Sequence, residues 1–453
     1  MTRLFGTDGV RGLANVDPVS PEIALALGRA AIEVLAPTPH DCKPVVVVGR
    51  DTRLSGTMLE SALMAGLCAA GANVFSAGVL PTAGVAYLTR TLNATAGVMI
   101  SASHNSFEDN GIKFFSASGH KLEDWQEDAM AEIIANPVRS EPLTGDRVGQ
   151  RLIDVEADAV RHYTDFLVSA YAGSLPLNLR IGLDCAHGAA STVAPELFRQ
   201  LGAYVAVCHA VPDGLNINHD CGSLHPERLQ QMVVDGALDV GFAFDGDADR
   251  LVAIDHTGAV LDGDYILAIS AQDLQSRGAL ASNMVVSTVM ANLGLDKTLQ
   301  AMDIELHKTK VGDKYVMQDM RAYGAVLGGE QSGHILYLDH HTTGDGLLTA
   351  VQLLNAMSAQ HVPLKELAQI LQKYPQVLVN VRLRHRCDPL QYDCVRDAVQ
   401  SAEAALRADG RILVRLSGTE PVARVMVEGP TQAVIVSIAN RIAQAITEAI
   451  GDV

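Results

Sequence analysis

Short runs of apolar and β-branched residues alternate with helix-like stretches along most of the chain. Five such runs predict strands, at 45–48, 97–100, 179–183, 240–244 and 284–289. Because strands that alternate with helices form helix-covered sheets, the chain is predicted to fold as an α/β protein. Loops that directly follow such strands lie where open α/β sheets bind ligands, so they are the first places to look for function.

Turn-rich seams near 136–154, 256–263 and 372–375 divide the 453 residues into four predicted domains, at 1–154, 155–258, 259–373 and 374–453. The first three are consistent with diverged copies of one βαβ module. The fourth differs, with strands predicted at 377–383, 412–416 and 422–427 and helices at about 391–408 and up to about 449. This order predicts a small α+β domain with an antiparallel sheet.

The composition excludes several classes of protein. With 48% hydrophobic and 19% charged residues, the chain is too apolar for a disordered scaffold. Its net charge of −18 argues against a nucleic-acid partner or an anionic membrane surface, since both need clustered positive charge. The uncharged stretch Ser61–Thr89 is long enough to cross a bilayer, but Gly71 and Pro81 divide it into a predicted helix, strand and helix.

The seven cysteines are odd in number and contain no C-x-x-C pair. This predicts buried free thiols in a reducing compartment, with neither a disulfide framework nor a zinc site. The charged, glycine-containing start MTRLFGTDGVRG is unlike the apolar core of a signal peptide, so a cytoplasmic protein is expected.

The loop Ser101-Ala102-Ser103-His104-Asn105 directly follows the predicted strand at 97–100. Two chemistries use a serine in this place: a nucleophile with His104 as its base, or a serine that carries a transferable phosphoryl group. The flanking residues form no G-x-S-x-G elbow, which disfavours acyl transfer. The alternative without chemistry is that Ser103 caps the next segment.

Asp245, Asp247 and Asp249 alternate in the loop after the predicted strand at 240–244. In a curved loop this spacing turns three carboxylates toward one hard cation. Arg250 and His256 stand where an EF-hand needs a glycine and a bidentate glutamate, which disfavours calcium sensing. Mg²⁺ held by three protein oxygens keeps positions for a phosphate oxygen and water. A solvated acidic turn is the alternative.

Two later loops carry hydrogen-bonding groups. The loop at 328–334 offers Glu330, Ser332 and His334, which suit sugar hydroxyls, although a polar hairpin turn has the same composition. The loop at 415–421 and the strand after it suit a phosphate, the alternative being a hairpin with exposed arginines. The phosphate-binding candidates there are Arg415, Ser417, Gly418, Thr419 and Arg424.

Three basic segments lie in the first predicted domain. Arg11 in FGTDGVRG and the arginines of GRDTR at 49–53 could present guanidinium to phosphate or form structural ion pairs. Lys113 is a candidate acid or base if it is desolvated, and otherwise extends its ammonium group to solvent. Neither a G-x-G-x-x-G nor a P-loop motif is present, which disfavours Rossmann dehydrogenases and P-loop kinases.

Six motifs occur in a fixed order: FGTDGVRG, GRDTR, SASHN, DGDADR, GEQSGH and RLSGTEP. In this combination the chain resembles the α-D-phosphohexomutase superfamily from Phe5 to Arg424. The opening motif and Gln331 are most similar to the branch that acts on glucosamine phosphate. The resemblance implies three related α/β domains and a smaller C-terminal α+β lid domain around one cleft.

The resemblance also implies a role for each motif. Ser103 would be the phosphoserine and, through its phosphate, would bind Mg²⁺ together with Asp245, Asp247 and Asp249. Catalytic assistance would come from Arg11, Lys113, Arg250 and His334. Sugar hydroxyls would contact Glu330, Ser332 and His334, and the distal phosphate would contact Arg415, Ser417, Gly418, Thr419 and Arg424. Ser106, His187 and Lys314 depart from the Pro, Asn and Arg usual in the family.

The implied reaction is a mutase cycle. Phosphorylated Ser103 would form glucosamine 1,6-bisphosphate from glucosamine 6-phosphate, and the bisphosphate would reorient and release glucosamine 1-phosphate for UDP-N-acetylglucosamine and peptidoglycan precursors. Glucosamine or glucose 1,6-bisphosphate would act as intermediate or activator, and a homodimer is implied. The alternatives are a mutase for mannose or glucose phosphates, a phosphatase, and a phosphosugar sensor, which the retained serine and aspartates disfavour.

Overall fold

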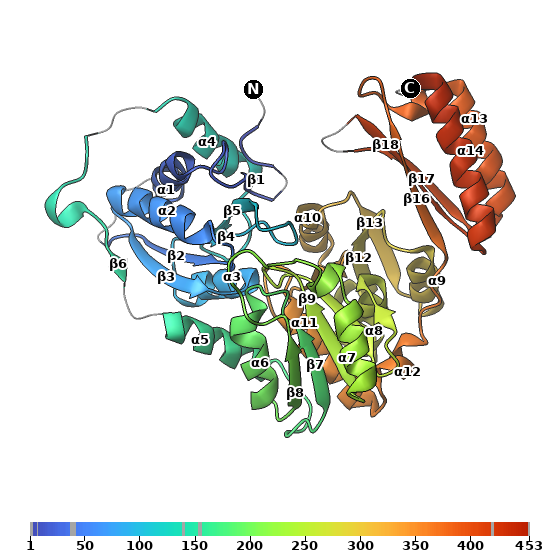
Figure 1. Cartoon of the computed structure of the whole chain (residues 1–453), viewed down its shortest axis with the longest axis horizontal. Coiled ribbons are helices and arrows are strands. Elements are labelled where there is room, and N and C mark those ends of the chain that lie inside the picture. The colour runs from blue at the N-terminus through green and yellow to red at the C-terminus, as the bar shows by residue number, and fades with distance from the viewer. Residues whose placement is uncertain are drawn as a thin grey trace. The chain divides into compact units, whose positions relative to one another are not determined.

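The computed structural model describes residues 3–6, 8–36, 42–137, 141–152, 156–417 and 421–451. Its strands form four sheets, which follow one another along the chain (Figure 1). Two compact units are distinct: residues 1–290 with 304–369, and residues 291–303 with 370–453. The first three sheets belong to the first unit and the fourth sheet to the second.

The first sheet has the strand order β1-β5-β4-β2-β3-β6. The strands β2, β3, β4 and β6 run parallel, whereas β5 runs antiparallel to both of its neighbours. The strands are β1 (Val10–Leu13), β2 (Val45–Arg50), β3 (Asn73–Val79), β4 (Ala96–Ile100), β5 (Asp109–Ser116) and β6 (Arg151–Leu152). The helices are α1 (Pro21–Leu35), α2 (Gly56–Ala69), α3 (Thr82–Thr91) and α4 (Asp124–Ala135).

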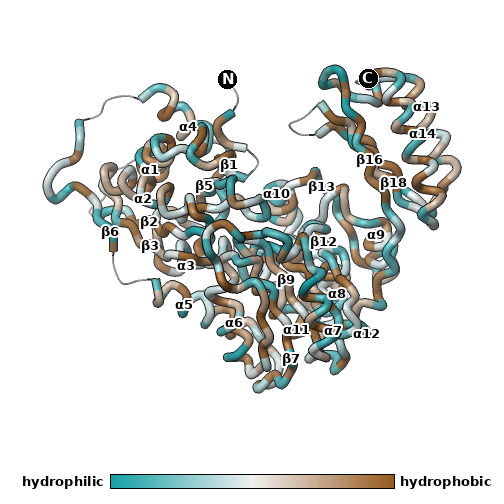
Figure 2. Tube along the Cα trace, in the orientation of Figure 1, coloured by the Kyte–Doolittle hydropathy of each residue, from teal (hydrophilic) through white to brown (hydrophobic). Residues whose placement is uncertain are grey.

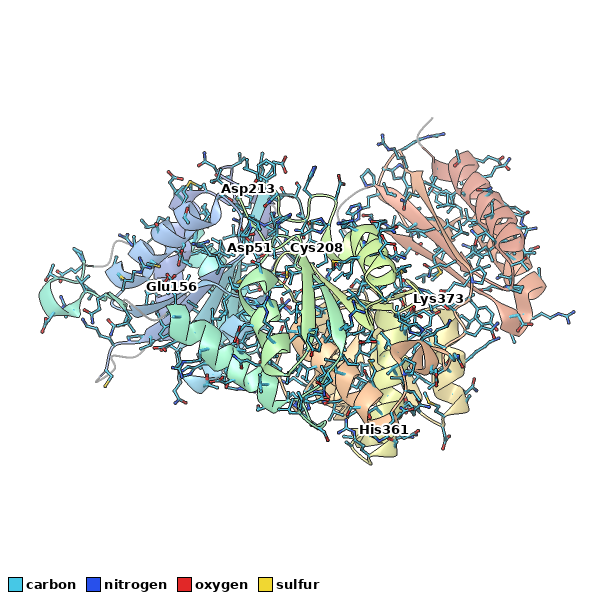
Figure 3. The ribbon with its side chains drawn as sticks, turned by 60° about the horizontal axis from the view of Figure 1, so that its bottom comes forward. Asp51, Glu156, Cys208, Asp213, His361 and Lys373 are labelled. Atoms are coloured by element: carbon cyan, nitrogen blue, oxygen red, sulfur yellow. The ribbon has the colours of Figure 1, made fainter. Side chains whose placement is uncertain are left out.

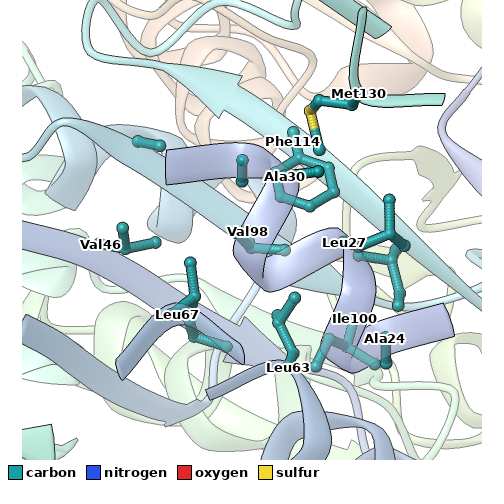
Figure 4. Close-up of a cluster of buried hydrophobic side chains, with 14 of the residues drawn as sticks. Ala24, Leu27, Ala30, Val46, Leu63, Leu67, Val98, Ile100, Phe114 and Met130 are labelled. Carbon is teal, nitrogen blue, oxygen red and sulfur yellow. The ribbon is translucent and has the colours of Figure 1, made fainter. Parts of the chain in front are cut away.

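A continuous apolar core lies between this sheet and its helices. Leu27 of α1 and Leu63 and Leu67 of α2 are buried together with Ile100 and Phe114 of the sheet (Figure 4). The two helices approach closely because their contact residues are glycines: a Cβ on Gly66 would lie 2.1 Å from the carbonyl oxygen of Leu25. This packing fixes the sheet edge from which the SASHN and GRDTR loops emerge.

The second sheet has the order β11-β10-β9-β7-β8. Its strands are β7 (Arg180–Asp184), β8 (Tyr204–Cys208), β9 (Val240–Phe244), β10 (Leu251–Asp255) and β11 (Val260–Leu261), and its helices are α5 (Glu156–Ser169), α6 (Ala190–Gln200) and α7 (Glu227–Asp235). Every residue of β9 is buried, which explains why the sequence shows it as an unbroken apolar run. The DGDADR loop therefore leaves a rigid, central strand.

The third sheet has the order β13-β12-β14-β15. Its strands are β12 (Met284–Thr288), β13 (Glu305–Thr309), β14 (Leu327–Gly329) and β15 (Ile335–Tyr337). The helices of this part of the sequence are α8 (Gly263–Ser276), α9 (Leu293–Ala301), α10 (Asp313–Tyr323), α11 (Gly346–Gln360) and α12 (Leu364–Ala368). The hairpin between β14 and β15 carries the GEQSGH motif, so this motif is both a turn and a potential site.

The fourth sheet is antiparallel, with the order β16-β18-β17. Its elements are β16 (Gln376–Arg382), α13 (Asp393–Leu406), β17 (Arg411–Leu416), β18 (Val422–Glu428) and α14 (Gln432–Ile450). The helix α14 alone among the described helices is long and apolar enough to cross a membrane. It buries Ile435, Ile442 and Ile446 against this sheet, and its hydropathy varies along its length (Figure 2).

A buried carboxylate joins α9 to the fourth sheet. Glu428, with no exposed surface, accepts hydrogen bonds from Asn292 Nδ2 and Leu293 N, both at 3.1 Å, and from Gln376 Nε2 at 2.8 Å. Arg411 Nη2 lies 2.9 Å from the same carboxylate. The segment at 291–303 therefore belongs to the second unit although strands of the first unit precede and follow it.

Most predicted elements are confirmed. Ser61–Thr89 falls within α2, β3 and α3, as the breaks at Gly71 and Pro81 indicated, and the last domain has the predicted antiparallel sheet. All seven cysteines are free thiols, but the prediction that they are buried is confirmed only for Cys185 and Cys221. Three others are partly buried, and Cys42 and Cys394 are exposed.

Candidate active site

Ser103 lies in the loop between β4 and β5 and is almost fully buried, at 3% exposed. Its Oγ donates a hydrogen bond to Asp245 Oδ2 at 2.8 Å and lies 3.2 Å from His104 Nδ1. Burial, together with the charges of Arg250 and Arg11, lowers the pKa of His104 to about 4, so this imidazole is neutral. No helix begins at Ser103, so the helix-cap interpretation is wrong. The serine faces a carboxylate cluster.

That cluster is the aspartate loop after β9. Asp245, Asp247 and Asp249 are each at most 5% exposed, and one oxygen from each lies within 4.8 Å of the others. Two of these buried oxygens, Asp247 Oδ1 and Asp249 Oδ1, accept no hydrogen bond from the described residues. Convergent, unsatisfied carboxylate oxygens are the ligands that Mg²⁺ prefers, so the residues fit the expected cation. The alternative of a solvated acidic turn is wrong.

Lys113 balances part of this negative charge. It leaves β5 with its side chain 2% exposed, and its Nζ lies 2.9 Å from Asp247 Oδ2 and 3.0 Å from Asp8 Oδ2. Burial acts to lower the pKa of Lys113, but the charges of Asp247, Asp8 and Asp249 outweigh it and hold the pKa above its ordinary value. The alternative in which Lys113 extends to solvent is therefore wrong.

Burial and neighbouring charges shift the pKa values of the two outer aspartates, Asp245 and Asp249, in opposite directions. Burial raises the pKa of Asp245 well above its ordinary value, and the neighbouring charges of Asp249 and Asp247 raise it further. Burial acts in the same direction on Asp249, but His334, Lys113 and Arg250 outweigh it and lower the pKa of that carboxyl. Asp245 therefore binds a proton readily, whereas Asp249 stays ionised. A bound cation would take the place of the proton on Asp245.

His334 and Arg250 flank the ionised aspartate. His334, at the end of the β14–β15 hairpin, lies 3.5 Å from Asp249 Oδ1 through Nδ1 and 3.5 Å from Asp313 Oδ2 through Nε2. Burial acts to lower the pKa of His334, but Asp249 and Asp313 raise it to about 9. Arg250 Nε lies 3.9 Å from Asp249 Oδ1. The hairpin thus brings a charged imidazole to the aspartate loop.

The two other sugar-binding candidates, Glu330 and Ser332, differ in how far they are buried. Glu330 is half-buried, and its Oε1 accepts a hydrogen bond from Gly312 N at 3.1 Å. Ser332 is exposed at the tip of the hairpin.

Arg11, one of the predicted catalytic residues, is partly exposed. Its Nη2 lies 3.0 Å from Asp8 Oδ2, so the same aspartate contacts both Arg11 and Lys113.

The arginine loop of the second unit is built on two neighbouring strands. Arg415 of β17 pairs with Arg424 of β18, and burial together with Arg424 lowers the pKa of Arg415. Ser417 is buried, and Arg386 Nη2 donates to its carbonyl oxygen at 3.5 Å. Two like charges side by side favour an anionic ligand. The candidates Gly418 and Thr419 lie outside the described residues.

Arg53 supports the backbone of the serine loop. Its guanidinium, 1% exposed, donates to the carbonyl oxygens of Ser103 at 2.9 Å and Asn105 at 2.8 Å, and also to those of Ser106 and Asp109. Asp51 holds Arg53 Nε at 2.8 Å and is labelled in Figure 3. Of the two uses weighed for GRDTR, the structural ion pair is correct for Arg53, and this arginine cannot reach a phosphate.

Sequence reasoning missed several residues of the site. Thr82, at the start of α3, donates its hydroxyl to Asp247 Oδ2 at 2.6 Å. Lys121 pairs with both Asp8 and Asp313, which joins the first and third sheets beside His334. No motif marks these residues, because each is defined by a partner more than a hundred positions away in the sequence.

Models of all four domains of one enzyme family match the chain. They are described as phosphoglucomutase/phosphomannomutase alpha/beta/alpha domains I, II and III and C-terminal domain, and they match residues 2–140, 161–258, 262–374 and 378–445. The chain belongs to the phosphoglucomutase/phosphomannomutase family. Membership explains why a serine, three aspartates and a sugar-type hairpin occur together, and it makes the protein a phosphohexomutase with the predicted four-domain α/β architecture.

Several relatives that match over nearly the whole chain are named phosphoglucosamine mutase. The chain is 48% identical over 448 residues to the one from Thermoanaerobacter sp. (strain X514), which covers 98% of this chain and 99% of that protein. It is 50% identical over 436 residues to the one from Moorella thermoacetica, covering 95% and 96%.

Solved phosphohexomutase structures share the fold. A phosphoglucomutase/phosphomannomutase family protein from Burkholderia thailandensis superposes with a TM-score of 0.80 at 25% identity, covering 99% of this chain and 98% of that one. The Aspergillus fumigatus N-acetylphosphoglucosamine mutase, solved with GlcNAc-6P and magnesium, has a TM-score of 0.69 at 18% identity, covering 98% and 95%.

Proposed function

We propose that this phosphohexomutase is a phosphoglucosamine mutase, which interconverts glucosamine 6-phosphate and glucosamine 1-phosphate. The observation that carries the proposal is the position of Ser103, whose Oγ lies 2.8 Å from Asp245 inside a triad of buried carboxylates. A serine that only needed a base would not require three carboxylates beside it, whereas a serine that carries a phosphoryl group needs a cation there. Relatives of that name at 48% and 50% identity support the choice of sugar.

The proposed cycle conserves the phosphoryl group. Phosphorylated Ser103 gives its phosphoryl group to the O1 hydroxyl of glucosamine 6-phosphate, so a P–O bond to the sugar forms as the bond to Oγ breaks. The proton that O1 loses balances the one that Oγ gains as Ser103 returns to its hydroxyl form. The resulting 1,6-bisphosphate reorients, and Ser103 Oγ takes the phosphoryl group from O6. Glucosamine 1-phosphate then leaves and supplies UDP-N-acetylglucosamine and cell-wall precursor synthesis. Glucosamine or glucose 1,6-bisphosphate would also restore an enzyme that has lost its phosphate.

The residues of the aspartate loop would hold Mg²⁺ together with the phosphoserine. The ion, bound by Asp245, Asp247 and Asp249, supplies charge neutralisation for the transferring phosphoryl group. Lys113 and Arg250 place two further positive charges at this loop without taking part as ligands. Lys113 carries a proton throughout the physiological range, so its part is to stabilise negative charge on the transferring group and on the leaving oxygen.

The sugar and its second phosphate are assigned to other loops. Glu330, Ser332 and His334 would hold sugar hydroxyls, with the protonated His334 as a donor and Glu330 as an acceptor. Arg415, Ser417, Gly418, Thr419 and Arg424 would hold the distal phosphate. The same proposal includes domain boundaries at 154, 258 and 373 and a lid movement of the C-terminal domain. It also includes a homodimer and a cytoplasmic location.

Turnover with three sugars tests the proposal. Purified protein with Mg²⁺ and a sugar bisphosphate primer is given glucosamine, glucose or mannose 6-phosphate, while free phosphate is monitored. We expect a marked preference in kcat/KM for glucosamine and no net phosphate release. A preference for glucose or mannose would keep the mechanism and overturn the substrate, whereas release of phosphate alone would identify a phosphatase. A Ser103→Ala protein with full turnover would refute the phosphoserine step.

A further inference from the structure

Three metal-ligating side chains meet at the end of the second sheet, outside the residues assigned to catalysis. Asp184 ends β7, His209 follows β8, and Cys221 lies in the loop before α7. One ligand atom from each lies within 4.8 Å of the other two. Asp184 and Cys221 are fully buried, at 0% and 1% exposed, while the His209 side chain is 24% exposed. The cluster is therefore enclosed on one side and reachable from solvent on the other.

The contacts within this cluster hold the carboxylate of Asp184 in place. Asp184 Oδ1 accepts a hydrogen bond from Ala186 N at 2.9 Å, and its Oδ2 lies 2.8 Å from His209 Nδ1. Cys221 is a free thiol in the same place. The carboxylate is held by its backbone contact, and the imidazole and the thiol are the groups that can turn toward an ion.

The distances are near those of a tetrahedral zinc centre. Zinc bonds of about 2.0 Å to N and O and about 2.3 Å to S place ligand atoms roughly 3.3–3.6 Å apart. The Asp184–His209 separation of 2.8 Å must widen slightly, and the other separations, at most 4.8 Å, must shorten by about 1 Å. The proposal requires rotation of the His209 and Cys221 side chains to supply these changes.

We propose that Asp184, His209 and Cys221 form a second metal site, which binds a thiophilic divalent cation of the zinc type. Binding displaces the proton of the Cys221 thiol to solvent, and His209 binds through a ring nitrogen that carries no proton. The Asp184 carboxylate and the Cys221 thiolate then neutralise the two charges of the ion, so no net charge is buried. Three protein ligands leave the fourth position for water at the exposed side of His209.

The thiol makes this site selective against magnesium. Cys221 contributes a sulfur atom, which soft cations prefer and the hard cation Mg²⁺ disfavours. A soft cation lowers the pKa of a coordinating thiol far enough to deprotonate it. The aspartate loop offers oxygen ligands only. We therefore expect the aspartate loop to bind Mg²⁺ and the Asp184–His209–Cys221 site to bind a softer cation such as zinc.

The new site lies directly behind the catalytic loops. Ala189 N, after the turn that begins at Asp184, donates to Gly246 O of the aspartate loop at 2.8 Å. A Cβ on Gly222, next to Cys221, would lie 2.4 Å from Phe244 O, and Asn218 Nδ2 donates to Ser103 O at 2.9 Å. An ion that joins these turns therefore stabilises the supports of both Ser103 and the aspartates.

The first test measures zinc retention under saturating Mg²⁺. Protein is incubated with zinc and excess Mg²⁺, desalted, and its bound zinc is determined by elemental analysis. We expect one zinc per chain in the wild type, and loss of it in Cys221→Ser and in His209→Ala. The matched control Cys394→Ser, which removes an exposed thiol of the second unit, should keep it. Equal zinc in Cys221→Ser and wild type, or zinc displaced by Mg²⁺, would overturn the proposal.

A second measurement needs no variant to fold. Cobalt substituted for zinc in the wild-type protein should give the thiolate-to-cobalt charge-transfer absorption of a cysteine ligand, and this band should persist in excess Mg²⁺. Zinc should also raise the midpoint of thermal unfolding in proportion to its binding. A cobalt spectrum with oxygen and nitrogen ligands only would refute the role of Cys221.

Discussion

The aspartate loop of the first unit and the arginine loop of the second both handle charge, but they are built in opposite ways. In the aspartate loop, buried carboxylates alternate with Lys113, Arg250 and His334, so positive and negative groups lie within 4.0 Å of one another. In the arginine loop, Arg415 and Arg424 lie side by side, and among the described residues no carboxylate is within ion-pair distance of either. The first is preorganised for chemistry. The second, in the part of the loop that the structure describes, holds like charges side by side.

The largest expected effect comes from a change in the aspartate loop. Asp247→Asn removes the charge that holds Lys113 at 2.9 Å and Thr82 at 2.6 Å, as well as one magnesium ligand. We expect kcat to fall by about 100- to 1,000-fold, as when a preorganised electrostatic contact is lost. The coupled assay that measures kcat also gives the Mg²⁺ dependence, which should shift to higher concentration. The exposed Asp235→Asn on α7 is the matched control, and an equal loss there would contradict the assignment.

The next prediction tests whether Arg53 positions the serine loop without taking part in the reaction. Arg53→Lys keeps the positive charge but cannot reach the four carbonyl oxygens that Arg53 contacts. Leaving such groups unpaired in the interior costs about 2–4 kcal/mol of unfolding free energy. We expect that loss in urea unfolding, and a roughly tenfold lower kcat with KM nearly unchanged. Arg29→Lys, on the exposed side of α1, should change neither. Unchanged kcat in a folded Arg53→Lys protein would show that the serine loop does not need this support.

The arginine loop should respond in KM rather than in kcat. Arg424→Ala removes one charge-assisted contact to the proposed distal phosphate, worth roughly 1–2 kcal/mol, so KM should rise by about tenfold. Initial-rate measurements over a range of glucosamine 6-phosphate concentrations give the split. Arg441→Ala, an exposed arginine of α14, serves as the control. If kcat fell as much as it does in Asp247→Asn, the contrast between the two loops would be wrong.

The last effect concerns stability alone and leaves the chemistry of both loops unchanged. Burial raises the pKa of Asp345 to about 6, and its carboxyl accepts from Leu348 N at 2.9 Å and Tyr163 Oη at 2.8 Å. A carboxyl with a raised folded-state pKa contributes stability below the unfolded-state pKa, and this is lost as pH rises through about 6. The loss is roughly 2–3 kcal/mol.

Asp345→Asn should remove this pH dependence, because asparagine caps a helix as aspartate does but does not ionise. Urea unfolding of both proteins from pH 4 to pH 7.5 gives the difference in unfolding free energy at each pH. The variant should gain stability relative to the wild type as pH rises. A difference that stays constant over this range would show that Asp345 does not titrate there.

The sequence predicted the strands and the loops that follow them because each is a local pattern. Ser103, Asp245, Asp247 and Asp249 were found in this way, since a polar loop after a buried strand is visible in a few residues. Arg53 was left between two interpretations, because only the fold shows that its guanidinium is enclosed by backbone. Asp184, His209 and Cys221 come from three loops, so no spacing rule could connect them.

Glu428 and the segment at 291–303 have a consequence for how the protein can evolve and be dissected. The chain passes between the two units at three points, after residues 290, 303 and 369. The second unit is therefore not a contiguous cassette: a fragment that starts at 374 would leave the Glu428 carboxylate without Asn292 and the backbone of Leu293. Recombination at the boundary after residue 369 alone would separate the segment at 291–303 from the rest of the second unit. We therefore expect family members to exchange the second unit only together with α9.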